Sequence, residues 1–275
     1  MKKALVLGGG GVTGIAWHLG LLCGLQRAGV PLGDADTVIG TSAGSVVGTL
    51  LTAGVDLEQA VARQEHEVAP RQAAPRSGND DWMAAMAVLA DPSVPAQQAR
   101  AQVGAMALAA STADEERYLA RMRSLLPVGD WPSSALRVVV VDTADGRDVV
   151  LDADSGAPLL HAVAASCAVP GLMPPVTIGD RRYMDGGVRF GAGADLATGV
   201  DRLVVIAPLA FLSRDRIVAE MAETGAGRTL LIEPDRASIE AFGQSFMDPA
   251  RRPDSVRAGL RQAETLADAV REVWS

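Results

Sequence analysis

The sequence has few cysteines and no apolar run long enough to cross a membrane. Its two cysteines, Cys23 and Cys167, are too few for a disulfide framework or a cysteine-rich metal site. The longest apolar runs, residues 136–141 and 203–212, are too short or too polar to span a bilayer, which takes about 20 consecutive apolar residues. We therefore expect neither a disulfide scaffold, a metal site nor a transmembrane helix.

Positive charge is also scarce. The chain has 25 Lys and Arg against 33 Asp and Glu, a net charge of −8, and no basic block interleaved with aromatic residues. Nucleic acid is therefore not an expected partner. Lysine occurs only at Lys2 and Lys3, which we interpret as the compositional bias of a bacterial genome. Only residues 4–7 separate these lysines from a glycine run, so a secretory signal is lacking and we expect a cytoplasmic protein.

Apolar residues, by contrast, are abundant enough for a full core in a chain of 275 residues, at 48% of the sequence. Residues 4–7 form a short apolar run that ends in glycines, and helical spacing follows over residues 15–27. Residues 37–39 and 45–51 repeat this order of strand, turn and helix. Such alternation predicts an α/β fold with a mostly parallel sheet covered by helices.

The segment from about residue 55 to residue 135 has a different character, because β-branched runs vanish and helix-start patterns accumulate. We interpret it as an all-helical insertion whose joints lie at residues 70–79 and 91–95. Three helix starts are expected in it: the capping boxes Asp56–Gln59 and Thr112–Glu115, and a cap at Asn79 or Asp80. Strands resume afterwards, with candidates at residues 136–141, 149–151, 176–178, 182–184, 203–207 and 229–232. A long C-terminal helix is predicted from the apolar stripe of Val256, Leu260, Ala263, Val270 and Trp274.

The first motif that points to chemistry is Gly40-Thr41-Ser42-Ala43-Gly44, a G-x-S-x-G sequence between a predicted strand and helix. A serine on such an elbow has a strained backbone and an exposed hydroxyl, and the small residues around it let the turn close. The positive end of the following helix points at the same place. The pattern therefore makes Ser42 a candidate nucleophile, although an ordinary tight turn would have the same letters.

The second motif is the glycine run of residues 8–14. Glycines can present backbone amides to an anion at close approach. Gly9, Gly11 and Gly14 also satisfy G-x-G-x-x-G after a strand, which is the fingerprint of dinucleotide binding. That alternative expects an acidic residue at the end of the second strand, but Asp34 and Asp36 precede this strand and the serine elbow follows it.

The third motif, Asp185-Gly186-Gly187, follows a predicted strand and offers a carboxylate that could activate Ser42. By itself Asp-Gly is more often a simple turn. The three histidines are His18, His66 and His161, and none lies in the last third of the chain, where the order Ser, Asp, His would place a triad histidine. The sequence therefore favours a serine activated by an aspartate over a triad of Ser42, Asp142 and His161.

Together these motifs resemble those of the patatin-like phospholipases, lipid acyl hydrolases with a Ser-Asp dyad and a core fold related to cytosolic phospholipase A2. The resemblance covers roughly residues 3–54 and 136–208. It rests on the three motifs above, on residues 141–146, and on the run Ala164-Ala165-Ser166-Cys167-Ala168-Val169-Pro170 followed by Pro174 and Pro175.

The resemblance implies a three-layer α/β/α domain over residues 1–275, with residues 55–135 as a helical cap at the active-site edge. It also implies Ser42 as nucleophile, Asp185 as base and the amides of Gly10 and Gly11 as oxyanion hole. The motif glycines are Gly9, Gly14, Gly40, Gly44, Gly186 and Gly187. No metal or organic cofactor is expected. The implied substrate is a lipid or another acyl ester, with transient and apolar contact to a membrane surface.

Two positions depart from the family pattern. Thr13 stands where the glycine loop usually has Arg or Lys, and the usual asparagine and proline are missing after Gly187. We consider Arg189 as a replacement for the lost cation. A non-catalytic acyl-binding homologue therefore stays open as an alternative. An acyl chain would find apolar surface on the insertion at Trp82, Met83, Met86, Met106, Met122 and Trp131, unless these residues form its own core.

Overall fold

The computed structural model describes residues 1–66 and 76–275. The strands are β1 Lys3–Leu7, β2 Thr37–Thr41, β3 Leu136–Asp142, β4 Asp148–Leu151, β5 Val176–Ile178, β6 Arg181–Asp185, β7 Arg202–Ile206 and β8 Arg228–Ile232. The helices are α1 Gly11–Arg27, α2 Ala43–Thr52, α3 Leu57–His66, α4 Arg76–Leu89, α5 Ala96–Ala109, α6 Glu115–Arg123, α7 Leu159–Ser166, α8 Ala210–Glu223, α9 Arg236–Phe242 and α10 Arg252–Trp274. Every predicted strand and the C-terminal helix are confirmed.

All eight strands belong to one sheet with the order β5-β6-β3-β2-β1-β7-β8, and β4 pairs with β3 off this path. Along the stretch β3-β2-β1-β7-β8 every pair of neighbouring strands is parallel. Strands β4, β5 and β6 are joined to the sheet by antiparallel pairs. The prediction of a mostly parallel α/β sheet is therefore confirmed. Because parallel strands all end at the same edge, the loops after β1, β2 and β7 lie together.

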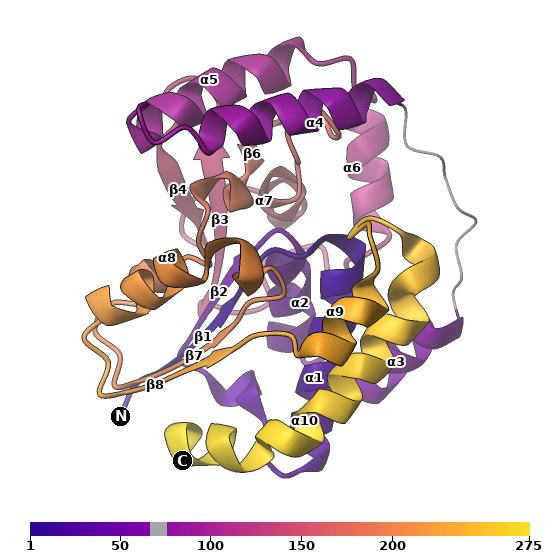
Figure 1. The fold of residues 1–275 in the computed structure, drawn as a ribbon, viewed down its shortest axis with the longest axis vertical. Coiled ribbons are helices and arrows are strands. Elements are labelled where there is room, and N and C mark those ends of the chain that lie inside the picture. The colour runs from indigo at the N-terminus through magenta and orange to yellow at the C-terminus, as the bar shows by residue number, and fades with distance from the viewer. Residues whose placement is uncertain (67–75) are drawn as a thin grey trace.

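Helices cover both faces of the sheet, which gives three layers (Figure 1). The alternation of side chains along β1 shows the division: Leu5 and Leu7 belong to the large core beneath α1, α2 and α10, while Ala4 and Val6 pack on the opposite face against α8. A third, smaller core joins α4 and α5 to the C-terminal part of β3 and to β6 through Ala85, Val103, Ala107, Val141 and Met184. In the described part of the chain, no helix is long and apolar enough to cross a membrane.

The helices of residues 55–135 divide into two groups. Helix α3 packs against α1 and α10, so it belongs to the main layer. Helices α4 and α5 lie side by side at the top of Figure 1, beyond the strands. Helix α6 packs on α7, where the hydroxyl of Tyr118 donates to the carbonyl of Ala164 at 3.0 Å. The segment at the edge of the sheet therefore starts with α4.

Of the three predicted helix starts, one is confirmed and two are wrong. Asp56 does cap α3, because its Oδ1 accepts the amides of Glu58 and Gln59. Thr112 was the wrong cap for α6: Asp114 accepts the amide of Glu116 at 2.8 Å, two residues further along. The expectation for Asn79 or Asp80 was also wrong, since α4 already begins at Arg76. Of the two predicted joints, residues 91–95 form a turn held by Asp91. The other was placed at residues 70–79: residues 70–75 lie outside the described residues, and residues 76–79 were wrongly assigned to it, because they belong to α4.

Candidate active site

The pairing of β3 brings Ser42 and Asp185 together. Strand β2 ends opposite Val139, and the antiparallel β6 ends opposite Val140. Strand β4 occupies the other edge of β3 over the same stretch, so β2 and β6 share one edge and meet end to end. Ser42 directly follows β2 and Asp185 is the last residue of β6. Their proximity is therefore a consequence of strand register.

The two side chains make a direct hydrogen bond. Ser42 Oγ donates to Asp185 Oδ2 at 2.8 Å, and both residues are buried. The second carboxylate oxygen of Asp185 accepts the amide of Gly187 at 2.7 Å. Burial raises the pKa of Asp185 from 3.8 to about 6, and the hydrogen bonds from Gly187 and Ser42 oppose this shift. The arrangement pairs a hydroxyl with a carboxylate that is a stronger base than an exposed aspartate.

The backbone of Ser42 is strained, as the elbow motif predicts. Its φ of 52° and ψ of −119° lie in a region that L residues rarely adopt. The turn also requires close approach at Gly44, where a Cβ atom would overlap the carbonyl oxygen of Leu7. The hydroxyl of Ser166 accepts the Ser42 amide at 2.8 Å and donates to the carbonyl of Val139 at 2.7 Å. Ser166 thus fastens the elbow to the middle of the sheet.

The glycine loop lies directly beside the elbow. A Cβ atom on Gly9 would be 3.5 Å from Cβ of Ser42, which places the loop in van der Waals contact with the serine. Gly10 precedes the first turn of α1 and Gly11 begins it with a φ of 60°. The first amides of a helix have no partner within it. Within the described residues, no protein group accepts from the amides of Gly10 or Gly11. The loop therefore presents free backbone donors near Ser42.

The histidines do not join this arrangement. Each of the three is described by the structure, and none hydrogen-bonds to Ser42. His18 is buried in α1 with Nε2 3.3 Å from the carbonyl oxygen of Ile206, and burial lowers its pKa to about 4. His66 Nδ1 lies 2.7 Å from the carbonyl oxygen of Ala62 on the surface of α3. Asp142, the other member of the alternative triad, binds Arg181 at 2.6 Å instead of His161.

Thr13 stands where the family usually has a cation, and Arg189 was considered as its replacement. Thr13 is fully buried, and its amide donates to the carbonyl of Phe246 at 3.1 Å, so this position faces the C-terminal part of the chain. Arg189 cannot replace a free cation, because its buried guanidinium pairs with Asp148 and Asp195, each at 2.7 Å. Both departures from the family pattern are accommodated by internal contacts.

A buried carboxylate that the sequence did not single out holds the loop after Gly187. Glu220 of α8 is fully buried, and its Oε2 accepts the amides of Ala192, Gly193 and Ala194 at 2.9–3.2 Å. A side chain on Gly191 would overlap this carboxylate. Burial raises the pKa of Glu220, with a smaller contribution from the neighbouring Asp195. These bonds hold the segment after Gly187, which lacks the asparagine and proline that are usual in the family.

Cys167 lies next to the elbow, with Sγ 3.8 Å from the hydroxyl of Ser45. Burial raises the pKa of the thiol to about 12, and the Asp185 charge adds to the shift. The thiol therefore stays protonated at neutral pH and does not compete with Ser42 as a nucleophile. In the described part of the chain, no group of three or more His, Cys, Asp or Glu side chains is arranged to hold a metal ion.

The apolar residues of the insertion have mixed positions. Met122 is buried in the main core, and Trp131 packs against that core while donating to the carbonyl of Ala157 at 2.8 Å. Met106 packs in the small core of α4 and α5. Met83 is 63% exposed on α4. For Met122 and Trp131, the structure therefore supports packing rather than a surface for an acyl chain.

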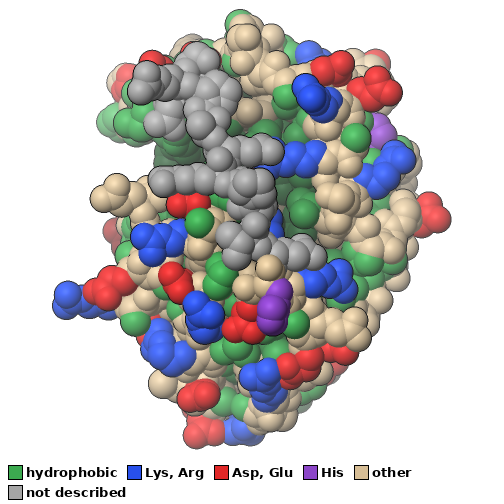
Figure 2. All heavy atoms as spheres, turned by 90° about the vertical axis from the view of Figure 1, so that its right-hand side faces the viewer, with side chains coloured by type: hydrophobic (Ala, Val, Ile, Leu, Met, Phe, Trp, Pro, Cys, Tyr) green, Lys and Arg blue, Asp and Glu red, His purple; other side chains and the backbone are tan. Residues whose placement is uncertain are grey.

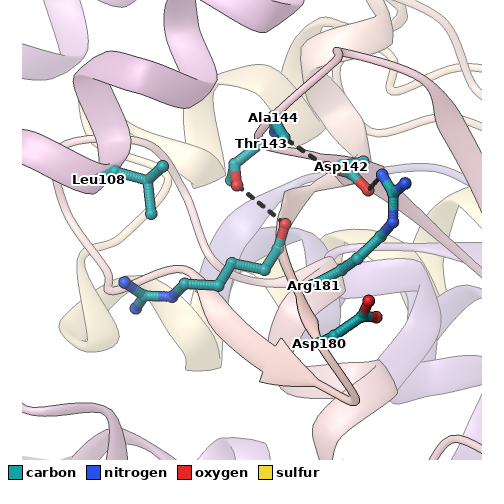
Figure 3. Close-up of a pocket in the computed structure, with 7 residues that line it drawn as sticks. Leu108, Asp142, Thr143, Ala144, Asp180 and Arg181 are labelled. Atoms are coloured by element: carbon teal, nitrogen blue, oxygen red, sulfur yellow. Dashed lines mark hydrogen bonds and ion pairs between the residues drawn. The ribbon is translucent and has the colours of Figure 1, made fainter.

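A separate depression of about 380 Å³ lies at the end of β3 and does not include the Ser42–Asp185 pair. It is lined by Leu108, Asp142, Thr143, Ala144, Asp180, Arg181 and Arg182. In Figure 3, Arg181 reaches Asp142 on one side of the depression, and Leu108 lies on the opposite side. Because Arg181 is paired with Asp142 and Asp145, this depression offers little free charge to a ligand.

Comparison with known proteins decides the family. Residues 5–198 match the family described as patatin-like phospholipase, and this stretch contains Ser42, Asp185 and the glycine loop. The chain belongs to this family. Comparison with curated proteins gave no significant match.

Solved structures with similar folds include VipD and ExoU. VipD from Legionella pneumophila has 16% identity and a TM-score of 0.49, with 98% of this chain and 67% of that chain covered. The type III effector ExoU has 18% identity and a TM-score of 0.41, with 96% and 53% covered. The ExoU–SpcU complex from the type III secretion system of Pseudomonas aeruginosa has 17% identity and a TM-score of 0.39, with 95% and 52% covered. The chain thus spans about half the length of ExoU.

Proposed function

We propose that this member of the patatin-like phospholipases is a serine acyl hydrolase for lipid or other apolar acyl esters, with Ser42 as nucleophile and Asp185 as base. The observation that carries the proposal is the 2.8 Å hydrogen bond from Ser42 Oγ to Asp185 Oδ2 beside free amides of the glycine loop. A nucleophile within hydrogen-bond reach of its base is the geometry that covalent catalysis needs.

In the first half of the reaction, Asp185 accepts the proton of Ser42 as Oγ attacks the carbonyl carbon of the ester. The amides of Gly10 and Gly11 stabilise the negative charge that develops on the carbonyl oxygen. The tetrahedral intermediate collapses with cleavage of the ester C–O bond, and the alcohol leaves with the proton from Asp185. A covalent acyl ester on Ser42 remains.

In the second half, water attacks the acyl carbon and gives its proton to Asp185. Cleavage of the acyl–Oγ bond releases the carboxylic acid, and the proton returns to Ser42. A base with a pKa of about 6 suits this cycle, because it is ionised at neutral pH and still basic enough to accept a proton. The chemistry is complete without a metal or an organic cofactor.

Within residues 55–135, helices α4 and α5 fit the role of a cap within a single catalytic domain. The turn after β3 contacts α5, since a Cβ atom at Gly104 would overlap the carbonyl oxygen of Thr143. A Cβ atom at Gly171 would lie 2.7 Å from the Asp81 side chain of α4. Helices α4 and α5 are thus seated on the loops that leave β3 and α7, close to the ends of the strands that hold Ser42 and Asp185. Segments so placed often act as lids.

A nitrophenyl ester of short chain length tests the proposal, with wild type and Ser42→Ala compared. We expect hydrolysis by the wild type and a loss of at least about 10³-fold in Ser42→Ala. Equal rates of hydrolysis in both proteins would contradict the proposal, and equal rates at the level of the uncatalysed reaction would leave a non-catalytic acyl-binding protein. The dinucleotide alternative predicts that a nicotinamide or flavin cofactor raises the thermal midpoint of unfolding. The proposal predicts no shift.

A further inference from the structure

An apolar patch of two exposed and two half-buried residues borders the glycine loop. We call it the rim patch and define it as Phe211, Leu212, Phe246 and Met247. Phe211 and Leu212, in the first turn of α8, are 47% and 59% exposed. The ring of Phe246 lies 6.1 Å from that of Phe211, centroid to centroid. Large apolar side chains gathered in this way are unusual on a protein surface, where they normally occur singly.

The rim patch is fastened to the loop that we assign to the oxyanion hole. A Cβ atom on Gly11 would lie 2.6 Å from the carbonyl oxygen of Phe246 and 2.9 Å from Sδ of Met247. On the other side, a Cβ atom on Gly10 would lie 2.8 Å from Pro208, three residues before Phe211. Phe246 and Met247 therefore lie against Gly11, and Pro208, which lies against Gly10, leads into the segment of Phe211, so that the patch adjoins the site where an ester carbonyl would be held.

Other exposed apolar residues serve as a comparison. Val218 and Ile239 are 44% and 41% exposed, on α8 and α9, and no contact ties either residue to the glycine loop. They represent the scattered apolar exposure that is normal for a soluble domain. The rim patch differs from them in its aromatic pair and in its attachment to the loop.

Charge around the rim patch gives no attraction to an anionic surface. Arg214 pairs with Glu233 at 3.1 Å, and Arg216 pairs with the buried Glu220 at 3.4 Å. The chain as a whole has a net charge of −8. Figure 2 shows the side of the molecule at the right of Figure 1, away from the label of α8, and there too acidic and basic side chains are intermixed outside the grey residues. Contact with lipid at this site would therefore be apolar rather than electrostatic.

We infer that the rim patch seats the protein on the surface of an uncharged or zwitterionic lipid aggregate, so that an ester can pass from the lipid to the glycine loop. The inference rests on the proposed function, because a lipid ester is the substrate that such an approach would deliver. Phe211 and Leu212 would enter the interfacial layer, and the neighbouring ion pairs would stay in water.

Vesicle binding tests the inference independently of catalysis. The Ser42→Ala protein, which cannot consume the lipid, is sedimented with phosphatidylcholine vesicles. It is compared with a variant that carries Phe211→Ser/Leu212→Ser in addition to Ser42→Ala. We expect this double change to weaken binding about tenfold or more. Val218→Ser/Ile239→Ser is the matched control and should leave binding unchanged. Phe211→Trp/Leu212→Met should restore binding, which excludes a folding defect as the cause.

The outcomes separate the inference from the proposed function. Binding of Ser42→Ala that is lost only with the rim patch supports the inference whatever the esterase assay shows. No binding by Ser42→Ala, or equal losses in the patch and control variants, would overturn it. Binding that appears only when anionic phosphatidylserine is added would also overturn it, because the contact would then be electrostatic.

Discussion

The hydroxyl of Ser166 holds the backbone of Ser42 in place: it accepts the Ser42 amide at 2.8 Å while donating to the carbonyl of Val139 at 2.7 Å. Ser166 comes from the end of α7, and Ser42 directly follows β2. The bond connects two segments more than a hundred residues apart in sequence and fixes the strained elbow. It also means that the Ser42 amide is already used and is not a free donor for an oxyanion.

Ser166→Ala should therefore lower kcat by roughly tenfold or more, because the nucleophile loses its fixed position. Unfolding free energy should fall by about 1–3 kcal/mol, since the Ser42 amide is left buried without a partner. Ser255→Ala is the matched control: its buried hydroxyl donates to the carbonyl of Arg251 at 2.8 Å, in α10. Urea unfolding and ester kinetics are measured on both variants. A control that loses as much activity as Ser166→Ala would refute a positioning role.

Strain at Ser42 predicts a difference between two inactive variants. A residue with a φ of 52° costs about 1–3 kcal/mol in this region unless it is glycine. The free energy of unfolding of Ser42→Gly should therefore exceed that of Ser42→Ala by about 1 kcal/mol, after the larger chain entropy of unfolded glycine is subtracted. Ser42→Gly should accordingly unfold at a higher temperature. Differential scanning calorimetry decides the point. Identical midpoints would mean that the strain relieved by glycine is no larger than its entropic cost, against the prediction.

The raised pKa of Asp185 predicts how stability varies with pH. The carboxyl titrates at about 6 when folded and near 3.8 when unfolded, so protonation favours the folded state. The stabilisation is full below pH 4 and is lost as pH rises through 6. Asp185→Asn keeps a neutral side chain at every pH. Its unfolding free energy should thus exceed that of the wild type by about 3 kcal/mol at pH 7 and by little at pH 4.

The same titration predicts an acid limb in the activity. Wild-type kcat/KM should fall tenfold per pH unit below about 6, because protonated Asp185 cannot accept the Ser42 proton. Ester hydrolysis measured from pH 4.5 to 8 provides the profile, and urea unfolding at pH 4 and 7 provides the stability difference. A constant difference between wild type and Asp185→Asn at both pH values would contradict the assignment of the raised pKa.

Glu220 is predicted to be essential for the loop after Gly187. Glu220→Ala leaves the amides of Ala192, Gly193 and Ala194 buried without a partner, so the unfolding free energy should fall by about 3 kcal/mol or more. Glu220→Gln keeps one carbonyl oxygen as an acceptor and should lose less. Urea unfolding followed by tryptophan fluorescence measures both. Equal losses for the two variants would show that the amide bonds are not what Glu220 contributes.

Much of this fold follows from local sequence patterns. The buried strands were predictable because runs such as residues 138–141, four consecutive valines, are β-branched and apolar. Ser42 was predictable because the elbow has a local signature. The meeting of Ser42 with Asp185 was not a local property, since it depends on β2 and β6 sharing one edge of β3. The motifs paired these two residues by their chemistry and the resemblance to a family implied their roles, but neither could show that they lie within hydrogen-bond distance.

Other features had no usable pattern. Glu220 lies in a helix with several charged residues, and nothing in its spacing indicates a buried carboxylate. Ser166 was part of a recognised run, but its role needs the three-dimensional position of the elbow. Thr112 was predicted as a cap because Thr112 and Glu115 have the spacing of a capping box, but helix boundaries depend on tertiary packing as well as on capping residues, and Asp114 caps α6.

The most direct test of the account is labelling of Ser42 by a fluorophosphonate probe in wild type, Asp185→Asn, His161→Gln and His18→Gln. If Asp185 activates Ser42, Asp185→Asn should reduce labelling and ester hydrolysis by 10²–10⁴-fold, while both histidine variants keep most of the wild-type activity. Circular dichroism confirms that each variant is folded. A loss of that size in His161→Gln, with Asp185→Asn near wild type, would contradict the account.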